Sequence, residues 1–142
     1  MDIYRMINSE FDQKEVDVRT YSPLVLAFMG DAVYEMIVRS VVVGKGNRQV
    51  EAMHKAKSKL VKAESQAIIA RELENEYTEE ELDIFKRGRN AKSYTSAKNA
   101  SIGDYRTATG FEALIGFLYM TGREKRALYL VKKGIEILSK EK

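Results

Sequence analysis

Two acidic residues stand alone inside strongly apolar stretches of this sequence. Asp31 lies in PLVLAFMGDAVYEMIV (residues 23–38), and Glu112 lies in RTATGFEALIGFLYM (residues 106–120). Both stretches carry apolar residues at every angle of a helical projection, so each predicts a buried helix. A buried carboxylate is costly unless it is paired, hydrogen-bonded or bound to a cation. Two such helices with one inward carboxylate each predict a hard-cation site, and Mg²⁺ fits because it accepts few protein carboxylates and keeps several waters.

Small residues flank Glu112 on its own face of the predicted helix. Gly116 lies one turn after it and Ala108 one turn before it. Residues four apart share a helix face, so this spacing predicts that another helix or a ligand comes close beside Glu112.

Composition sets the class of protein. A chain of 142 residues with 44% hydrophobic residues predicts one domain over residues 1–142, with a substantial core. The lack of Cys excludes a disulfide scaffold, a zinc–thiolate site and a cysteine nucleophile. The N-terminus is too acidic and polar for a signal peptide, and Asp31, Glu35 and Arg39 interrupt the longest apolar run. We therefore expect a cytoplasmic protein without a membrane span.

Helix signals occur along the whole chain, and strand-like alternation is missing, so the fold is predicted to be all-α. Ser22-Pro23 is a strong helix start, and Thr78 with Glu81 forms a capping box. The predicted helices are Ile3–Phe11, Pro23 to about Val43, Arg48–Lys57, an amphipathic surface helix within Met53–Tyr77, Glu79 to about Arg89, the Glu112 helix and Arg123–Lys140. Asn47 is predicted to cap the third of these helices, and Gly122 to close the Glu112 helix. The packed face of the last helix is predicted to carry Ala127, Leu128, Val131, Ile135 and Leu138.

Positive charge is concentrated in one segment. Residues 84–107 contain six basic residues and only Asp104 as an acid, a net charge of +5 in a chain whose total is +3. The segment from Lys86 to Thr109 mixes these bases with Ser, Thr, Asn and Gly, which predicts a loop that binds phosphates and sugar hydroxyls. A basic loop that is simply solvated is the alternative. The candidate RNA-binding residues are Lys86, Arg87, Arg89, Lys92, Lys98 and Arg106, with Lys55, Lys57 and Lys59 extending the contact.

Two motifs give the chain a family resemblance. AFMGDAVYE (residues 27–35) resembles the signature helix of the ribonuclease III family, usually written NERLEFLGDAVL, and TGFEALIGFLYM (residues 109–120) resembles the family's second catalytic helix. The resemblance implies an all-α endonuclease domain, a homodimeric bundle of about seven helices. The chain resembles the Mini-ribonuclease III branch, which is a bare nuclease domain. The resemblance rests on the segments KRGRNAKS and HKAKSKLVKAESQA and on the absence of a double-stranded-RNA-binding domain after Lys142.

The resemblance assigns roles position by position. Asp31 and Glu112 fall on family carboxylates that are metal-linked and catalytic, whereas Ala27 and Thr109 stand where the family has a glutamate and an aspartate. The branch is similar in these losses, which predict a reduced site with water-mediated Mg²⁺ binding. Phe28 matches an aromatic residue that inserts into the partner subunit, with an ordinary core position as the alternative.

The function implied by the resemblance is Mg²⁺-dependent cleavage of both strands of double-stranded RNA, leaving 5′-phosphate ends. Likeness to the branch implies maturation of large-subunit (23S) ribosomal RNA, with a large-subunit ribosomal protein bound to the substrate. Glu35 either orients a metal-bound water or makes an ordinary buried hydrogen bond. Two alternatives remain: a non-catalytic protein that binds structured RNA on the same fold, and a helical interaction module in which Asp31 and Glu112 pair with Arg39 or Arg106.

Overall fold

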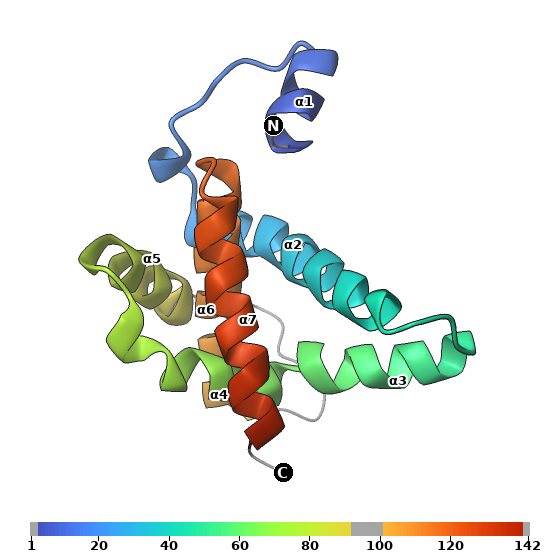
Figure 1. Cartoon of the computed structure of the whole chain (residues 1–142). Helices are drawn as coiled ribbons and strands as arrows, with labels where there is room; N and C mark the ends of the chain where they lie inside the picture. Colours follow the sequence, from blue (N-terminus) through green and yellow to red (C-terminus); the bar gives the residue numbers. More distant parts are fainter. Residues whose placement is uncertain (1–2, 92–100, 141–142) are drawn as a thin grey trace.

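The computed structural model describes residues 3–91 and 101–140, which fold as an all-α bundle without strands (Figure 1). The all-α prediction and the expected number of helices are confirmed for this part of the chain. Two single 3₁₀ turns lie at Val18–Thr20 and Glu74–Glu76. The helices are α1 (Ile3–Glu10), α2 (Pro23–Gly44), α3 (Val50–Val61), α4 (Ala63–Glu72), α5 (Glu79–Asn90), α6 (Ile102–Met120) and α7 (Glu124–Lys140). None of the helices described is both long and apolar enough to cross a bilayer.

Helix α6 is the centre of the bundle. Helices α2, α4, α5 and α7 all pack against it, and every residue from Thr107 to Met120 is buried except Glu112. The prediction of a buried Glu112 helix is therefore confirmed. The helix begins earlier than expected because the Ser101 side chain accepts a hydrogen bond from the Asp104 amide, at 3.0 Å. This is a helix N-cap.

The predicted basic loop from Lys86 to Thr109 is wrong at its C-terminal end, and at its N-terminal end it overlaps the helix predicted from Glu79 to about Arg89, which is confirmed. Residues 86–90 form the last turn of α5, and residues 102–109 form the first two turns of α6. The apolar residues Ile84 and Phe85 anchor the end of α5 in the core, which keeps the helix intact through the basic residues that follow. Lys92 and Lys98 lie outside the described residues.

Helix α2 is buried on one side only, which corrects the prediction of a helix buried all round. Leu26, Val33 and Val38 lie in the core, whereas Phe28 and Met36 are exposed. The helix begins as expected, since the Ser22 side chain accepts a hydrogen bond from the Val25 amide at 3.3 Å. A helical projection of the sequence cannot distinguish apolar residues that enter the core from apolar residues that face outward, and α2 has both kinds.

Two glycines bring the backbones of α2 and α6 into direct contact. A Cβ atom added to Gly30 would overlap the Glu112 backbone carbonyl, and one added to Gly116 would overlap the Leu26 carbonyl. The close approach predicted beside Gly116 is confirmed, and the neighbour is α2. Because Asp31 follows Gly30 directly, this crossing brings Asp31 to Glu112.

The segment predicted as one surface helix within Met53–Tyr77 is two helices with a break at Lys62. Lys62 has an extended backbone conformation (φ −64°, ψ 152°), and three side chains cap the last turn of α3. Tyr34, Ser65 and Gln66 donate hydrogen bonds to the carbonyls of Leu60, Lys59 and Val61, at 2.7, 2.6 and 2.8 Å. Helix α4 is consequently packed in the core instead of lying on the surface.

The remaining predicted boundaries hold with small changes. The capping box at Thr78 and Glu81 is present, Gly122 (φ +75°) separates α6 from α7, and Gln49 rather than Asn47 precedes α3. On α7, Leu128 is exposed and Leu130 takes its place in the core. The Arg126 guanidinium binds both oxygens of the buried Glu81 at 2.8 Å, which fastens α7 to the start of α5.

We expect Gly30→Ala to destabilise the protein by about 3 kcal/mol, because the added methyl group must push α2 and α6 apart. Chemical denaturation measures the change. Gly103→Ala is the matched control, since a Cβ atom at Gly103 meets nothing within 4 Å. Equal stabilities of the two variants would contradict the proposed backbone contact.

Candidate active site

Asp31 and Glu112 lie side by side at the α2–α6 crossing. Their carboxyl groups are within hydrogen-bonding reach, Glu112 mostly buried and Asp31 exposed. The predicted pairing of the two carboxylates is therefore present, but the prediction that Asp31 is buried is wrong. The side chain of Asp31 follows the contact residue Gly30 by one position, which turns it out of the helix–helix contact and into the open.

Burial, the negative charge of Asp31 and the hydrogen bond between the two carboxyl groups, in that order of importance, together raise the pKa of Glu112 to about 8. The Gln66 side chain partly opposes this effect because its Nε2 donates to Glu112 Oε2 over a long distance of 3.4 Å. A carboxylate whose ionisation is opposed by burial and by a neighbouring negative charge forms a site whose charge is best neutralised by a bound cation.

Basic side chains do not neutralise this pair. Within residues 3–91 and 101–140, no ion pair involves Asp31 or Glu112. Arg39 binds Glu35 at 2.8 Å, and Arg106 is exposed on α6. The alternative in which Asp31 and Glu112 pair with Arg39 or Arg106 is therefore wrong.

The donor set fits Mg²⁺ better than a metal that needs many protein ligands. No group of three or more His, Cys, Asp or Glu side chains that could hold a metal occurs in the part of the chain that the structure describes. Ala27 is buried beside the crossing, and the Thr109 hydroxyl donates to the Tyr105 carbonyl of its own helix at 3.0 Å. Two carboxylates thus remain, and Mg²⁺ binds through one or two carboxylates and keeps its waters.

Glu35, one turn after Asp31, is held by two bases. Its Oε1 accepts from Arg39 Nε at 2.8 Å and lies 3.0 Å from Lys57 Nζ on α3. Burial raises the pKa of Glu35, but the hydrogen bonds and positive charges of Arg39 and Lys57 outweigh it and leave the pKa below its usual value. Glu35 is thus an ion-pair partner that joins α2 to α3. This contact resembles the alternative of an ordinary hydrogen bond more than the alternative of a group that orients a metal-bound water.

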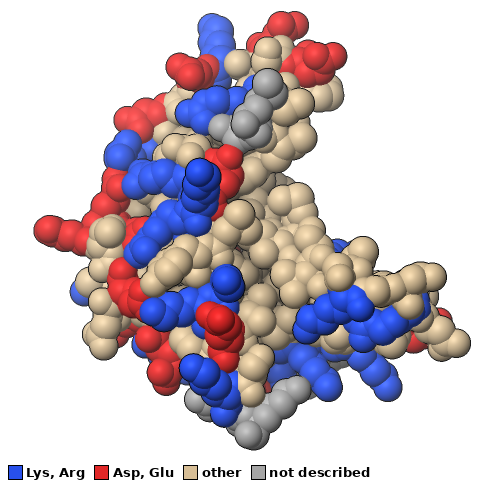
Figure 2. All heavy atoms as spheres, viewed as in Figure 1, with Lys and Arg blue, Asp and Glu red and all other residues tan. Residues whose placement is uncertain are grey.

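The outer side of α2 is hollowed beside Asp31. Phe28, Met29, Asp31, Ala32 and Glu35 line an open hollow of about 320 Å³. Phe28 is 79% exposed, so the alternative of an ordinary core position is wrong. Figure 2 shows that uncharged residues line the re-entrant surface between the upper part of the molecule and the arm formed by α3.

The predicted basic side chains lie on several helices. Figure 2 shows a concentration of Lys and Arg along the α3 arm, where Lys55 and Lys59 are exposed and Lys57 turns toward Glu35. On α5, Lys86 and Arg87 are exposed, whereas the Arg89 guanidinium lies over the Phe85 ring, 5.6 Å from its centre. The predicted basic residues within the described ranges thus divide between α3, α5 and α6.

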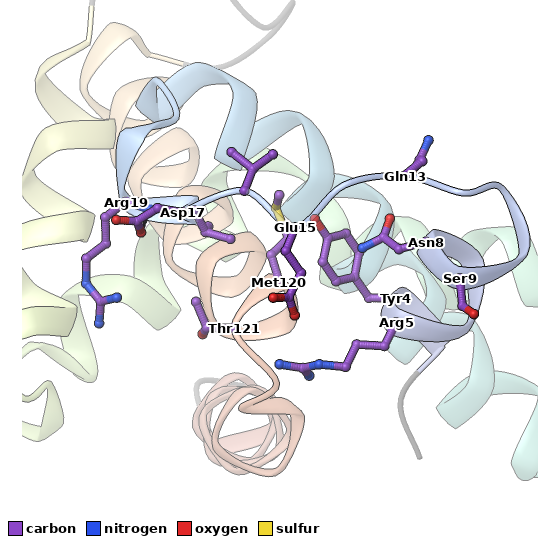
Figure 3. Close-up of a pocket in the computed structure, with 12 residues that line it drawn as sticks. Tyr4, Arg5, Asn8, Ser9, Gln13, Glu15, Asp17, Arg19, Met120 and Thr121 are labelled. Carbon is purple, nitrogen blue, oxygen red and sulfur yellow. Dashed lines mark hydrogen bonds between the residues drawn. The ribbon is translucent and has the colours of Figure 1, made fainter.

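A separate cavity of about 710 Å³ lies between α1, the segment that follows it and the end of α6 (Figure 3). Arg5, Asn8, Glu15 and Arg19 are among its polar lining residues, with Met120 at its inner side. Neither Asp31 nor Glu112 lines this cavity, and it is not part of the candidate active site.

Gln66 is the site neighbour that the sequence analysis missed. A glutamine among the polar residues of MHKAKSKLVKAESQAIIARELENEY has no pattern that distinguishes it from a surface position. Gln66 lies beside Glu112 because the helix breaks at Lys62 and α4 packs in the core. Gly30 was also missed, although its position directly before Asp31 and the small residue Gly116 on the partner helix were available signals.

Comparison with known proteins gives a consistent class. The Ribonuclease III domain family matches residues 24–123. A "Mini-ribonuclease 3" of Clostridium tetani is 45% identical over 92% of this chain and 86% of its own, and one of Brevibacillus brevis is 48% identical over 88% and 93%. The crystal structure of a protein from Fusobacterium nucleatum superposes with a TM-score of 0.76 at 32% identity, over 89% of this chain and 99% of that one.

The fold, the carboxylate pair and these similarities define an endoribonuclease of the ribonuclease III type, a class that cleaves double-stranded RNA. The chain belongs to the ribonuclease III family and, within it, to the Mini-ribonuclease III branch.

The raised pKa of Glu112 makes stability depend on pH. Between the ordinary value of 4.5 and about 8, the unfolded chain releases a proton that the folded chain retains, so stability falls as pH rises through this window. We expect Glu112→Gln to remove this loss and to stabilise the metal-free protein by about 2 kcal/mol at about pH 8.5, with the gain vanishing toward about pH 5.

Thermal unfolding in EDTA across this pH range measures the effect. The control is Glu136→Gln, an exposed position on α7, which should leave the pH dependence as it is in the parent. Parallel curves for Glu112→Gln and the parent would contradict a raised pKa of Glu112.

Proposed function

We propose that this protein is a Mg²⁺-dependent, homodimeric nuclease that cleaves double-stranded RNA in the cytoplasm during maturation of large-subunit (23S) ribosomal RNA. The observation that carries the proposal is the Asp31–Glu112 pair, held together by a backbone contact and not neutralised by any basic side chain of the described residues. The ribosomal RNA substrate, and a large-subunit ribosomal protein bound to it, follow from the resemblance to the Mini-ribonuclease III branch.

Asp31 and Glu112 have different environments and hence different roles. Asp31 is exposed and borders the hollow on α2, so its carboxylate is accessible to a cation from solvent. Glu112 is mostly buried and holds the inner side of the site. Bound Mg²⁺ supplies positive charge that lowers the pKa of water and offsets the charge developing on the phosphate.

The exposed bases on α3, α5 and α6 would hold the RNA backbone. Phosphate contacts from Lys and Arg carry no sequence information, but they position a duplex and make affinity fall with salt concentration. The exposed members are Lys55, Lys59, Lys86, Arg87 and Arg106, while Lys57 and Arg89 contribute charge from their contacts with Glu35 and Phe85. Lys92 and Lys98 remain part of the proposal on the sequence alone.

A second copy of the chain is proposed to cover the outer side of α2. Phe28 is 79% exposed, and Met36 and Val43 continue an exposed apolar row along the same helix. Large apolar side chains that leave a core helix for solvent mark an interaction surface. Because Phe28 and Asp31 line the same hollow, a partner seated there would border the active site.

We expect Asp31→Asn to abolish Mg²⁺-dependent cleavage of a labelled RNA duplex while RNA binding and the unfolding midpoint change little. Asp31 is exposed and has no ion-pair partner among the described residues, and an asparagine can still hydrogen-bond to Glu112, so the substitution removes the charge of a cation ligand at little structural cost. Cleavage is measured at low salt with Mg²⁺ and with EDTA.

Asp83→Asn, at an exposed position on α5, is the matched control and should cleave normally. Binding without cutting at any Mg²⁺ concentration by the parent protein would favour the non-catalytic RNA-binding alternative. Undiminished cleavage by Asp31→Asn would show that Asp31 is not needed for cleavage.

We expect Phe28→Ala to raise the dimer dissociation constant by about 30-fold, as for an interface hot spot, and to leave the stability of the monomer unchanged because the ring has no core contacts to lose. Sedimentation over a range of concentrations measures the constant. Leu128→Ala removes an exposed apolar side chain from α7 and should leave it unchanged. A protein that is monomeric with or without Phe28 would exclude the proposed dimer.

A further inference from the structure

Gln66 is a buried polar residue in direct contact with the Asp31–Glu112 pair. Its side chain is only 3% exposed, and it projects from the first turn of α4 immediately after the break at Lys62. Its Nε2 donates to the Val61 carbonyl at 2.8 Å and lies 3.4 Å from Glu112 Oε2. One amide group therefore links the end of α3 to the partly buried Glu112 carboxylate.

The two neighbours fix the orientation of this amide. The Val61 carbonyl and the Glu112 carboxylate are both acceptors, so the NH₂ group and not the oxygen must face them. The remaining atom, Gln66 Oε1, is buried and has no hydrogen-bond partner among the described residues. An unpaired buried acceptor costs free energy, so the amide is held here at a cost that its two donated hydrogen bonds must offset.

Gln66 caps the Val61 carbonyl, but capping at this break does not require contact with Glu112. Ser65 and Tyr34 already cap the neighbouring carbonyls of Lys59 and Leu60, and the Ser65 hydroxyl does so at 2.6 Å without touching Glu112. What distinguishes Gln66 from Ser65 is its second hydrogen bond, to Glu112.

We propose that Gln66 is a positioning residue of the active site, whose amide holds the Glu112 carboxylate in place for a divalent cation and so sets the affinity of the site for Mg²⁺. The inference rests on the proposed function, because it assigns a role toward the proposed cation. Groups that orient a metal ligand typically change metal affinity by tenfold or more when they are replaced.

The test compares Gln66→Met with Ser65→Ala. Methionine keeps the volume of the side chain and loses both hydrogen bonds, whereas Ser65→Ala removes a cap from the same break and leaves Glu112 alone. Isothermal titration with Mg²⁺ at about pH 8 should show a dissociation constant raised by about tenfold or more in Gln66→Met and unchanged in Ser65→Ala. Turnover of Gln66→Met at low Mg²⁺ should fall and recover at high Mg²⁺, while RNA binding in EDTA stays at the level of the parent.

Equal Mg²⁺ affinity of Gln66→Met and the parent would overturn the inference and leave the proposed function intact. A parent protein that binds no divalent cation and cuts no RNA would instead overturn the proposed function itself. Gln66→Asn, which keeps the amide but shortens its reach by one methylene, is the second variant and should lose Mg²⁺ affinity as well. Failure of both variants to fold would assign Gln66 to the α3–α4 break alone and overturn the proposal.

Discussion

The contact between the backbones of α2 and α6 is the constraint on which the site depends. Gly30 and Gly116 are needed because a Cβ atom at either position would overlap a carbonyl of the opposite helix. The same contact presses the Gly30 backbone against that of Glu112, so the residue after Gly30 necessarily lies next to Glu112. The geometry of the carboxylate pair is therefore set by close packing in the core and not by a flexible loop.

The site combines one partly buried carboxylate, that of Glu112, with one exposed carboxylate, that of Asp31. Ionisation of Glu112 is costly in this environment, and the adjacent charge of Asp31 increases that cost. A cation bound between the two carboxylates would therefore be favoured. The surrounding bases do not relieve it, because Arg39 and Lys57 are already engaged by Glu35 one turn further along α2. The ion pairs of Glu35 thus leave the Asp31 carboxylate available for a cation, and the pair with Lys57 also connects α3 to α2.

The sequence predicted the closeness of Asp31 and Glu112 better than their surroundings. Glu112 stood out as a lone acid in an apolar helix, and Gly116 correctly indicated a close neighbour. Asp31 was identified for a reason that proved wrong, since its helix is apolar all round but only half-buried. Phe28 and Met36 produce that pattern because exposed apolar side chains and core side chains look the same in a helical projection.

Other features depend on tertiary contacts that no local pattern records. The stretch around Lys62 consists of good helix formers, and the helix breaks there because Tyr34, Ser65 and Gln66 satisfy the carbonyls of the preceding turn. Two of these three residues are adjacent in sequence, but Tyr34 comes from α2, so the full set assembles only in the folded protein. The burial of Gln66 beside Glu112 follows from this break.

A crystal grown with Mn²⁺ in place of Mg²⁺ tests the central claim most directly, because the anomalous signal of Mn²⁺ locates the cation without reference to activity. A single strong peak within coordinating distance of both Asp31 and Glu112 is the expected result. An empty site between the two carboxylates at saturating Mn²⁺, or a peak elsewhere on the chain alone, would contradict the claim that the α2–α6 crossing builds a cation site.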